Sequence, residues 1–180
     1  MPRGYRRRYR YYRSGRSKYS NETTSIVYAT PSAYAASTTF PIGIDSQGNQ
    51  FRGVVIVPAT TVYGTRKAKN FDISITTAGT ETPIVAALVY VPQGTYAGDM
   101  NVAAFTGDSV VSLYEPNQNV IGQFVIPATF DNTTQTVTRF KTRLSRNLDS
   151  GDQIVLLFGN ADQIPQDAAI CGTVNYAIKY

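Results

Sequence analysis

The chain has 180 residues and a formal net charge of +5, from 17 lysines and arginines and 12 aspartates and glutamates, with one cysteine and no histidine or tryptophan. This length suits one domain with a substantial core rather than two. Without histidine, Ser-His-Asp and Cys-His catalysis and the common histidine metal sites are excluded within the chain, and one cysteine excludes an intrachain disulfide.

The first predicted element is a basic arm, residues 1–22. Its first eighteen residues contain eight of the seventeen basic residues and no acidic residue. The rest of the chain contains nine basic and twelve acidic residues, so the body has a formal net charge of −3. Such a block of like charge has little aliphatic surface to bury, which predicts an arm that is disordered when free and that only a polyanion could order. No apolar stretch follows it, so we expect no secretory signal peptide.

The composition of the arm indicates single-stranded nucleic acid as the polyanion. Arginine presents a planar fork of donors to phosphate oxygens, and tyrosine offers a flat surface on which an unpaired base can stack. The same basic cluster also fits a nuclear import signal. The candidate nucleic-acid contacts are Arg3, Arg6, Arg7, Arg8, Arg10, Arg13, Arg16, Lys18, Tyr5, Tyr9, Tyr11 and Tyr12.

The body, residues 23–180, has an all-β pattern: short runs of β-branched and aromatic residues separated by Gly, Pro, Asn and Asp. About ten strands around one core most economically form two packed sheets, as in a jelly roll or another sandwich. We expect strands at Ser25–Ala29, Ser37–Ile44, Gly53–Val57, Phe71–Thr77, Pro83–Val91, Val110–Tyr114, Val120–Ile126, Thr136–Leu144, Gln153–Phe158 and Cys171–Ile178.

Alternation assigns faces to some of these strands. Phe71, Ile73 and Ile75 alternate with polar residues, which predicts a half-buried strand. The segments 84–91 and 154–158 are apolar almost throughout, which is typical of central strands covered on both faces. The bases of the segment 66–69 are expected in a loop.

A second basic candidate lies in the segment 137–144. Alternation places Phe140, Thr142 and Leu144 toward the core and a row of three bases away from it. We add this row to the candidate nucleic-acid contacts, and a solvated strand face is an equally good interpretation. The row consists of Arg139, Lys141 and Arg143.

The remaining polar residues give no sign of catalysis. Phosphate-binding glycine motifs are missing from the sequence, and Asp149 and Asp152 fit a hairpin turn better than a catalytic pair. Cys171, in an apolar strand, is expected to be a small buried side chain rather than a nucleophile. We therefore expect a protein that is not an enzyme and has no cofactor or metal.

Several segments resemble the capsid proteins of small circular single-stranded DNA viruses that encode a replication initiator, the circoviruses and their relatives. They are the arginine–tyrosine arm, "ALVYVPQGT" at 87–95, "SLYEPNQNVIGQFVI" at 112–126, "RLSRNLDSGDQIVLLF" at 143–158 and "VNYAIKY" at 174–180. The chain is similar to this family over the arm and most of residues 80–180. It departs from circoviruses proper in being shorter and in lacking tryptophan and histidine.

The resemblance implies an eight-stranded antiparallel jelly roll that assembles with identical copies into a small icosahedral shell. The arm would lie inside, against a single-stranded DNA genome. It also implies a host nuclear import receptor and a cell-surface receptor as partners, no membrane, and a location in the virion and, during assembly, in the host nucleus. Two alternatives stay open: the capsid of a small RNA or satellite virus, and a cellular single-strand-binding β module with a basic tail.

Overall fold

The computed structural model describes residues 19–27, 42–44, 50–78, 80, 83–97, 119–129, 135–160 and 169–180. The predicted arm contacts up to Lys18 and the predicted strand Val110–Tyr114 lie outside these residues. In the described residues there are nine strands and no helix that could cross a membrane. The strands are β1 (Ser20–Val27), β2 (Ile42–Ile44), β3 (Gln50–Val57), β4 (Arg66–Ala78), β5 (Ile84–Val91), β6 (Val120–Ile126), β7 (Thr136–Leu148), β8 (Gln153–Asn160) and β9 (Ala169–Lys179).

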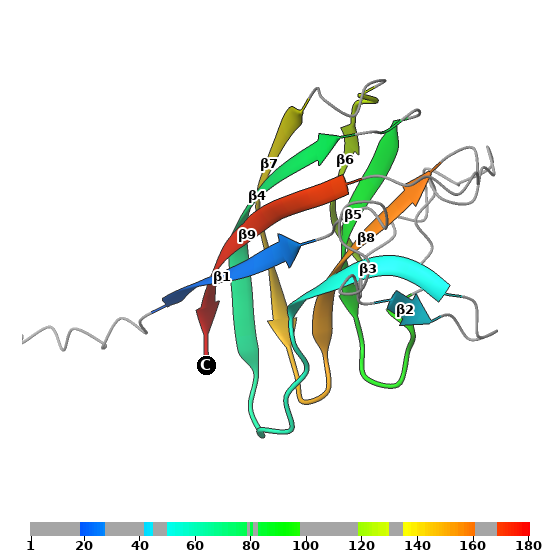
Figure 1. Cartoon of the computed structure of the whole chain (residues 1–180). Helices are drawn as coiled ribbons and strands as arrows, with labels where there is room; N and C mark the ends of the chain where they lie inside the picture. The colour runs from blue at the N-terminus through cyan, green and yellow to red at the C-terminus, as the bar shows by residue number, and fades with distance from the viewer. Residues whose placement is uncertain are drawn as a thin grey trace, which may run out of the picture.

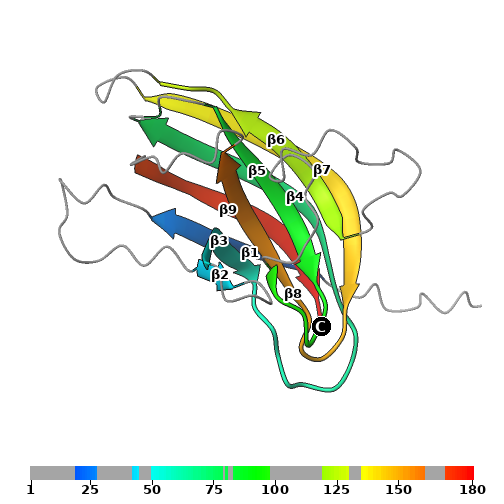
Figure 2. The same ribbon diagram turned by 90° about the vertical axis from the view of Figure 1, so that its right-hand side faces the viewer.

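The strands form two antiparallel sheets that face each other (Figures 1 and 2). Sheet A has the order β1-β9-β4-β7, and sheet B has the order β2-β3-β8-β5-β6. The three-residue β2 only extends the edge of sheet B beside β3, and the other strands give four to each sheet. From β3 onward the chain repeatedly crosses between the sheets, as it does in a jelly roll. The predicted all-β jelly roll is therefore confirmed.

The core lies between the sheets and is built by alternation along each strand. On β4, Phe71, Ile73 and Ile75 are at most 1% exposed, and they pack with Leu88 of β5 and Leu156 of β8. Burying each such side chain contributes roughly 1.5–3 kcal/mol to folding. The predicted inward face of this strand is thus confirmed.

Sheet B is also buried on its other face. Ala87 and Val89 of β5 form a second apolar cluster with Val155 and Leu157 of β8, and all four are at most 3% exposed. The register pairs Ala87 with Leu157 and Val89 with Val155. This arrangement confirms the prediction that the two non-alternating segments are central strands covered on both faces.

The structure extends β4 toward its N-terminus beyond the prediction. Residues 66–69, which were expected to be in a loop, are strand residues: all four pair with β7, and 67–69 also pair with β9. A β-bulge separates this extension from the rest of β4, and its residue Asn70 has a φ of 56°. Asparagine tolerates this left-handed conformation better than most residues. The expected loop is therefore wrong because pairing on both sides outweighs the weak strand propensity of the segment.

Leu144 corrects a second prediction. Its side chain is 57% exposed rather than in the core. The register between β4 and β7 moves from Lys69–Ser145 to Phe71–Thr142, so two residues of β7, Arg143 and Leu144, lie opposite Asn70. This bulge interrupts the regular approach of β7 to its neighbour, and Leu144 is left at the surface.

The body begins earlier than expected. Strand β1 starts at Ser20, which pairs with Ile178 of β9, and Glu22 pairs with Tyr176. The predicted boundary between residues 22 and 23 therefore falls inside a strand. Polar residues form this strand because β9 satisfies its backbone hydrogen bonds at the edge of the sheet.

Candidate nucleic-acid interface

The predicted basic row lies on β7, on the side of sheet A that faces away from the core. Arg139, Lys141 and Arg143 are all exposed, whereas Phe140 between them is partly buried and stacks on Phe124 of β6 with 4.9 Å between ring centroids. The alternation predicted for these three bases is correct.

The structure adds three lysines that the sequence interpretation missed. Lys67 and Lys69 of β4 alternate with the buried Arg66 and Ala68, so their side chains point away from the core. Lys179 of β9 lies directly opposite Lys67 and follows the buried Ile178, and so it points the same way. We call this outer side of sheet A the basic face, with the cations Lys67, Lys69, Arg139, Lys141, Arg143 and Lys179.

The bulge at Asn70 decides the direction of two of these lysines. Beyond the bulge, Asp72 faces outward and Phe71 inward, so an uninterrupted strand would point Lys67 and Lys69 into the core. The bulge adds one residue and restores the outward direction. Alternation alone could not have found these lysines, and the hint in the sequence was the position of an asparagine.

Carboxylates on the basic face are few. Asp72 lies opposite Lys141, and its Oδ2 is 2.7 Å from Lys141 Nζ. Both side chains are well exposed, at 41% and 70%, so this ion pair contributes at most about 1 kcal/mol to stability. In the described part of the chain, no carboxylate lies within ion-pair distance of Lys67, Lys69 or Lys179.

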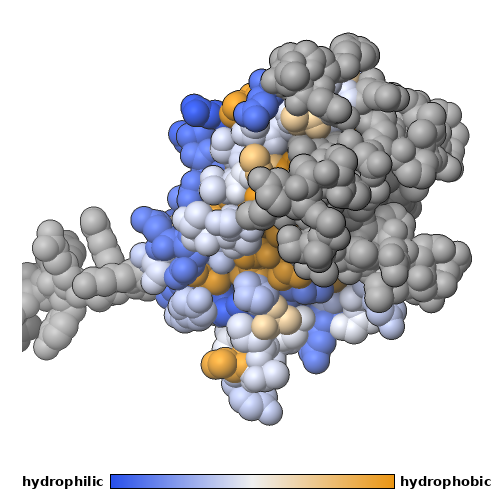
Figure 3. Space-filling model, viewed as in Figure 1, coloured by the Kyte–Doolittle hydropathy of each residue, from blue (hydrophilic) through white to orange (hydrophobic). Residues whose placement is uncertain are grey.

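Short polar side chains fill the area between the cations. Thr23 of β1 donates a hydrogen bond to Asn175 Oδ1 of β9 at 2.7 Å, and Ser74 lies between Arg139 and Thr173 in register. In the space-filling view, the side of the molecule formed by sheet A is predominantly hydrophilic (Figure 3). The result is a polar surface bordered by bases, which suits contacts with phosphates and sugars.

The basic face continues to the C-terminal end of the arm. The Nζ atom of Lys69 lies 3.9 Å from the ring centroid of Tyr19, a cation–π contact. Tyr19 directly precedes Ser20, whose partner Ile178 lies next to Lys179. The chain therefore enters sheet A at β1, next to β9 (Figure 1), and the residue at this entry contacts a lysine of the basic face.

The turn between β7 and β8 has a structural role, as predicted. Asp152 is 5% exposed, and its carboxylate accepts hydrogen bonds from Tyr90 Oη at 2.6 Å, Asp149 N at 2.8 Å and Gln93 N at 3.0 Å. Gly151 completes the turn with a φ of 89°, a conformation that glycine adopts without strain. These contacts make the Asp152 carboxylate part of the hairpin turn that the sequence predicts.

The charges of this turn shift two ionisations. Burial by itself would raise the pKa of Asp152, but the hydrogen bonds from Tyr90, Asp149 N and Gln93 N, together with the charge of Arg66, hold it below its ordinary value. Burial, the hydrogen bond to Asp152 and the charge of Asp152 raise the pKa of Tyr90 to about 12. The pair thus consists of an ionised carboxylate and a neutral phenol at neutral pH.

The loop between β3 and β4 is attached to the same turn. Arg66 is 6% exposed and donates to the carbonyl oxygens of Pro58 at 3.0 Å and Asp152 at 3.1 Å. The carbonyl of Thr60 accepts from Gly151 N at 2.9 Å and from Ser150 Oγ at 3.2 Å. Hydrogen bonds at Thr60 and at Arg66 therefore hold both ends of the loop.

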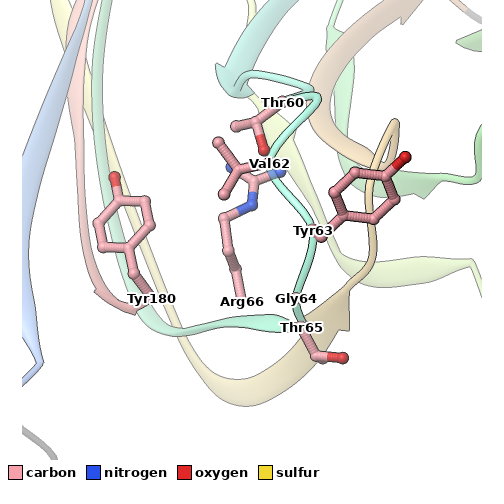
Figure 4. Close-up of a pocket in the computed structure, with 7 residues that line it drawn as sticks. All are labelled: Thr60, Val62, Tyr63, Gly64, Thr65, Arg66 and Tyr180. Atoms are coloured by element: carbon pink, nitrogen blue, oxygen red, sulfur yellow. The ribbon is translucent and has the colours of Figure 1, made fainter.

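A small cavity of about 120 Å³ lies beside this loop, and its lining is mostly apolar. The side chain of Val62 lies beside that of Arg66, Tyr180 lies across from both, and Tyr63 points away from Tyr180 (Figure 4). The cavity is the size of one side chain, and both described hydrogen bonds of the Arg66 guanidinium go to backbone carbonyls.

Cys171 is exposed, which corrects the prediction of a buried side chain. It follows the buried Ile170 on β9 and pairs with Thr76, so it lies on the outer side of sheet A. Among the described residues, no group of His, Cys, Asp or Glu side chains has the arrangement of a metal site.

Comparisons with known proteins add no family. No family model and no curated protein matches the chain. One similar solved structure is the C-terminal CBM6 of LamC, a laminarinase from Zobellia galactanivorans, at 13% identity and a TM-score of 0.34 over 88% of this chain and 100% of that chain. Another is an uncharacterized protein from Listeria monocytogenes EGD-e in complex with glucose, magnesium and calcium, at 13% identity and a TM-score of 0.32 over 91% of this chain and 11% of that chain. The jelly-roll assignment therefore rests on the strand order of the two sheets and not on either comparison.

Proposed function

We propose that the protein is a viral capsid subunit that assembles with identical copies into a small icosahedral shell and packages single-stranded DNA. The observation that carries the proposal is the continuity between the arm and the basic face, made at the contact of Tyr19 with Lys69. The six cations of the face therefore lie next to the residue that follows the eight bases of the arm in the sequence, and residues 19–180 as a whole carry a net charge of −3.

In this proposal the basic face lines the inner wall of the shell. The bases Arg139, Lys141 and Arg143 alternate along β7, which spaces their Cα atoms by roughly 6.4–6.8 Å. Successive phosphates of an extended single-stranded nucleic acid have a similar spacing. One nucleic-acid strand can therefore run along β7 with a phosphate next to each of these three basic side chains. Such contacts bind any sequence, as packaging of a whole genome requires.

Exposed apolar side chains away from the basic face support self-assembly. Tyr63 is 97% exposed and Val62 is 71% exposed on the loop whose base is held by the turn at 149–152, and Val125 of β6 is 56% exposed. Because hydrogen bonds hold the ends of this loop, its exposed apolar side chains lose little conformational entropy when another subunit packs against them.

Electron microscopy of the purified protein, with and without single-stranded DNA, tests the proposal. We expect closed particles of uniform size that protect DNA from added nuclease. Only monomers or small oligomers under all conditions would contradict the shell. Particles whose content is degraded by ribonuclease after opening, and not by deoxyribonuclease, would instead indicate an RNA virus.

The arm deletion 1–18 separates packaging from folding. We expect the shortened protein to retain its β-sheet circular dichroism while losing most of its salt-sensitive binding to oligonucleotides. A cellular binding module is the alternative that predicts the opposite result, since its isolated body would bind with nearly full affinity.

A further inference from the structure

Lys67, Lys179 and Tyr19 lie on three adjacent strands at one end of the basic face. Lys67 of β4 and Lys179 of β9 are directly opposite in register, and Tyr19 enters β1 on the other side of β9. Neighbouring strands are about 4.8 Å apart, so the three side chains share one small area of the surface. Neither lysine belongs to the predicted row on β7, which is separated from β9 by β4.

The two lysines repel each other in the free subunit. Like charges directly opposite on neighbouring strands are destabilising. Lys69, two residues after Lys67 on the same side of β4, adds a third positive charge. Among the described residues no carboxylate pairs with any of the three. An anion placed between Lys67 and Lys179 relieves this repulsion, which makes the pair a position for a phosphate group.

Tyr19 provides the second half of the site. Its ring is half-buried and is fixed from one side by Lys69 Nζ, 3.9 Å from the centroid. An aromatic ring held in this way is a stacking platform that needs little further ordering when a base binds. Phosphate and base contacts are thus available side by side.

From this geometry we propose a nucleotide subsite at the root of the arm, which binds one phosphate of single-stranded DNA between Lys67 and Lys179 and stacks its base on Tyr19. The proposal rests on the proposed packaging function and assigns it a fixed contact in the body. The eight bases of residues 1–18 directly precede Tyr19 in the sequence. The subsite would therefore hold the single-stranded DNA at a fixed position, at the end of the arm where β1 begins.

The absence of tryptophan from the chain allows a direct test. In full-length Tyr19→Trp the only indole stands at the stacking position, and Tyr96→Trp, on a 52% exposed residue beyond β5 of the other sheet, is the matched control. We expect a single-stranded thymidylate oligonucleotide to quench the indole emission of Tyr19→Trp strongly and that of Tyr96→Trp weakly. A duplex, whose bases are already stacked, should quench neither.

The lysines are tested in the Tyr19→Trp background. Changing Lys67 and Lys179 to serine should weaken the binding that the indole reports and reduce the slope of log affinity against log salt by about 0.7 per lost phosphate contact. Changing both to arginine should preserve the slope, because the charges are kept.

Two results would overturn the subsite. One is an indole in Tyr19→Trp that does not respond to the oligonucleotide, in protein that protects single-stranded DNA in particles, which would leave the packaging function standing. The other is an unchanged salt slope in the double serine variant while the indole is still quenched. A protein that binds no oligonucleotide at all would remove the packaging function and the subsite together.

Discussion

Replacing the buried Asp152 by asparagine tests the role assigned to the turn at 149–152. The carboxylate accepts three hydrogen bonds, from Tyr90 Oη, Asp149 N and Gln93 N, at 2.6, 2.8 and 3.0 Å. An asparagine has one acceptor oxygen, so its NH₂ group must face either Asp149 N or Gln93 N, and that backbone donor loses its partner. The loss of one charge-assisted bond and the burial of an unsatisfied donor together cost about 2–4 kcal/mol.

Chemical and thermal unfolding of the unassembled subunit, followed by circular dichroism, measures this loss. For a chain of this size the expected drop in Tm is roughly 5–15 °C. The control is Asp149→Asn in the same turn, because Asp149 is exposed and its side chain accepts a hydrogen bond from Thr65 Oγ1, at 2.8 Å, at the surface. We expect Asp149→Asn to cost less than about 1 kcal/mol. Equal stabilities of wild type and Asp152→Asn would refute the reasoning.

The pH dependence provides a second measurement on the same variant. The pKa of Asp152 is lower in the folded protein than its ordinary value of 3.8, so its ionised form contributes stability that is fully present above that value. The contribution is lost as pH falls through the lowered pKa. The difference in stability between wild type and Asp152→Asn should therefore be constant near neutral pH and become smaller in strong acid.

Three further predictions concern the basic face. Asp72→Asn should free Lys141 for a phosphate, strengthen oligonucleotide binding at low salt and steepen the salt slope by about 0.7; an unchanged affinity and slope would count against the face. Changing Arg139 and Arg143 to serine should reduce that slope by about 1.4 at little cost in stability, whereas an unaltered slope would leave the row a solvated strand face. Cys171 should react with a bulky maleimide in the free subunit and be shielded in intact particles, and equal labelling in both would place the basic face outside.

Alternation was sufficient to predict most of the architecture. Strand β6 has its predicted bounds, and β5 and β8 were correctly predicted as central strands because both faces of each carry apolar residues. Alternation along β9 also predicts that the side chain of Cys171 is exposed. Ile170, Val174 and Ile178 are spaced to share the inner face of β9, which leaves Cys171 outside, whereas the apolar character of its neighbours favours burial.

The part of the candidate site that could not be predicted depends on partners distant in sequence. Residues 66–69 have weak strand propensity, and they are strand residues because β7 pairs with all four of them and β9 pairs with 67–69. Lys179 is identified as a neighbour of Lys67 only by the register of β9. Each β-strand pattern gives the faces of its own strand, whereas the composition of a surface depends on how several strands are aligned.

The bulge at Asn70 makes the basic face sensitive to chain length as well as to residue type. Deleting this one residue leaves every charge in the sequence, yet it would exchange the two sides of residues 66–69 relative to the rest of β4. Relatives that keep the lysines but lack the extra residue would have an equally basic composition and a different outer side of sheet A. Comparing such chains by net charge alone would miss this difference, and aligning them at this position would reveal it.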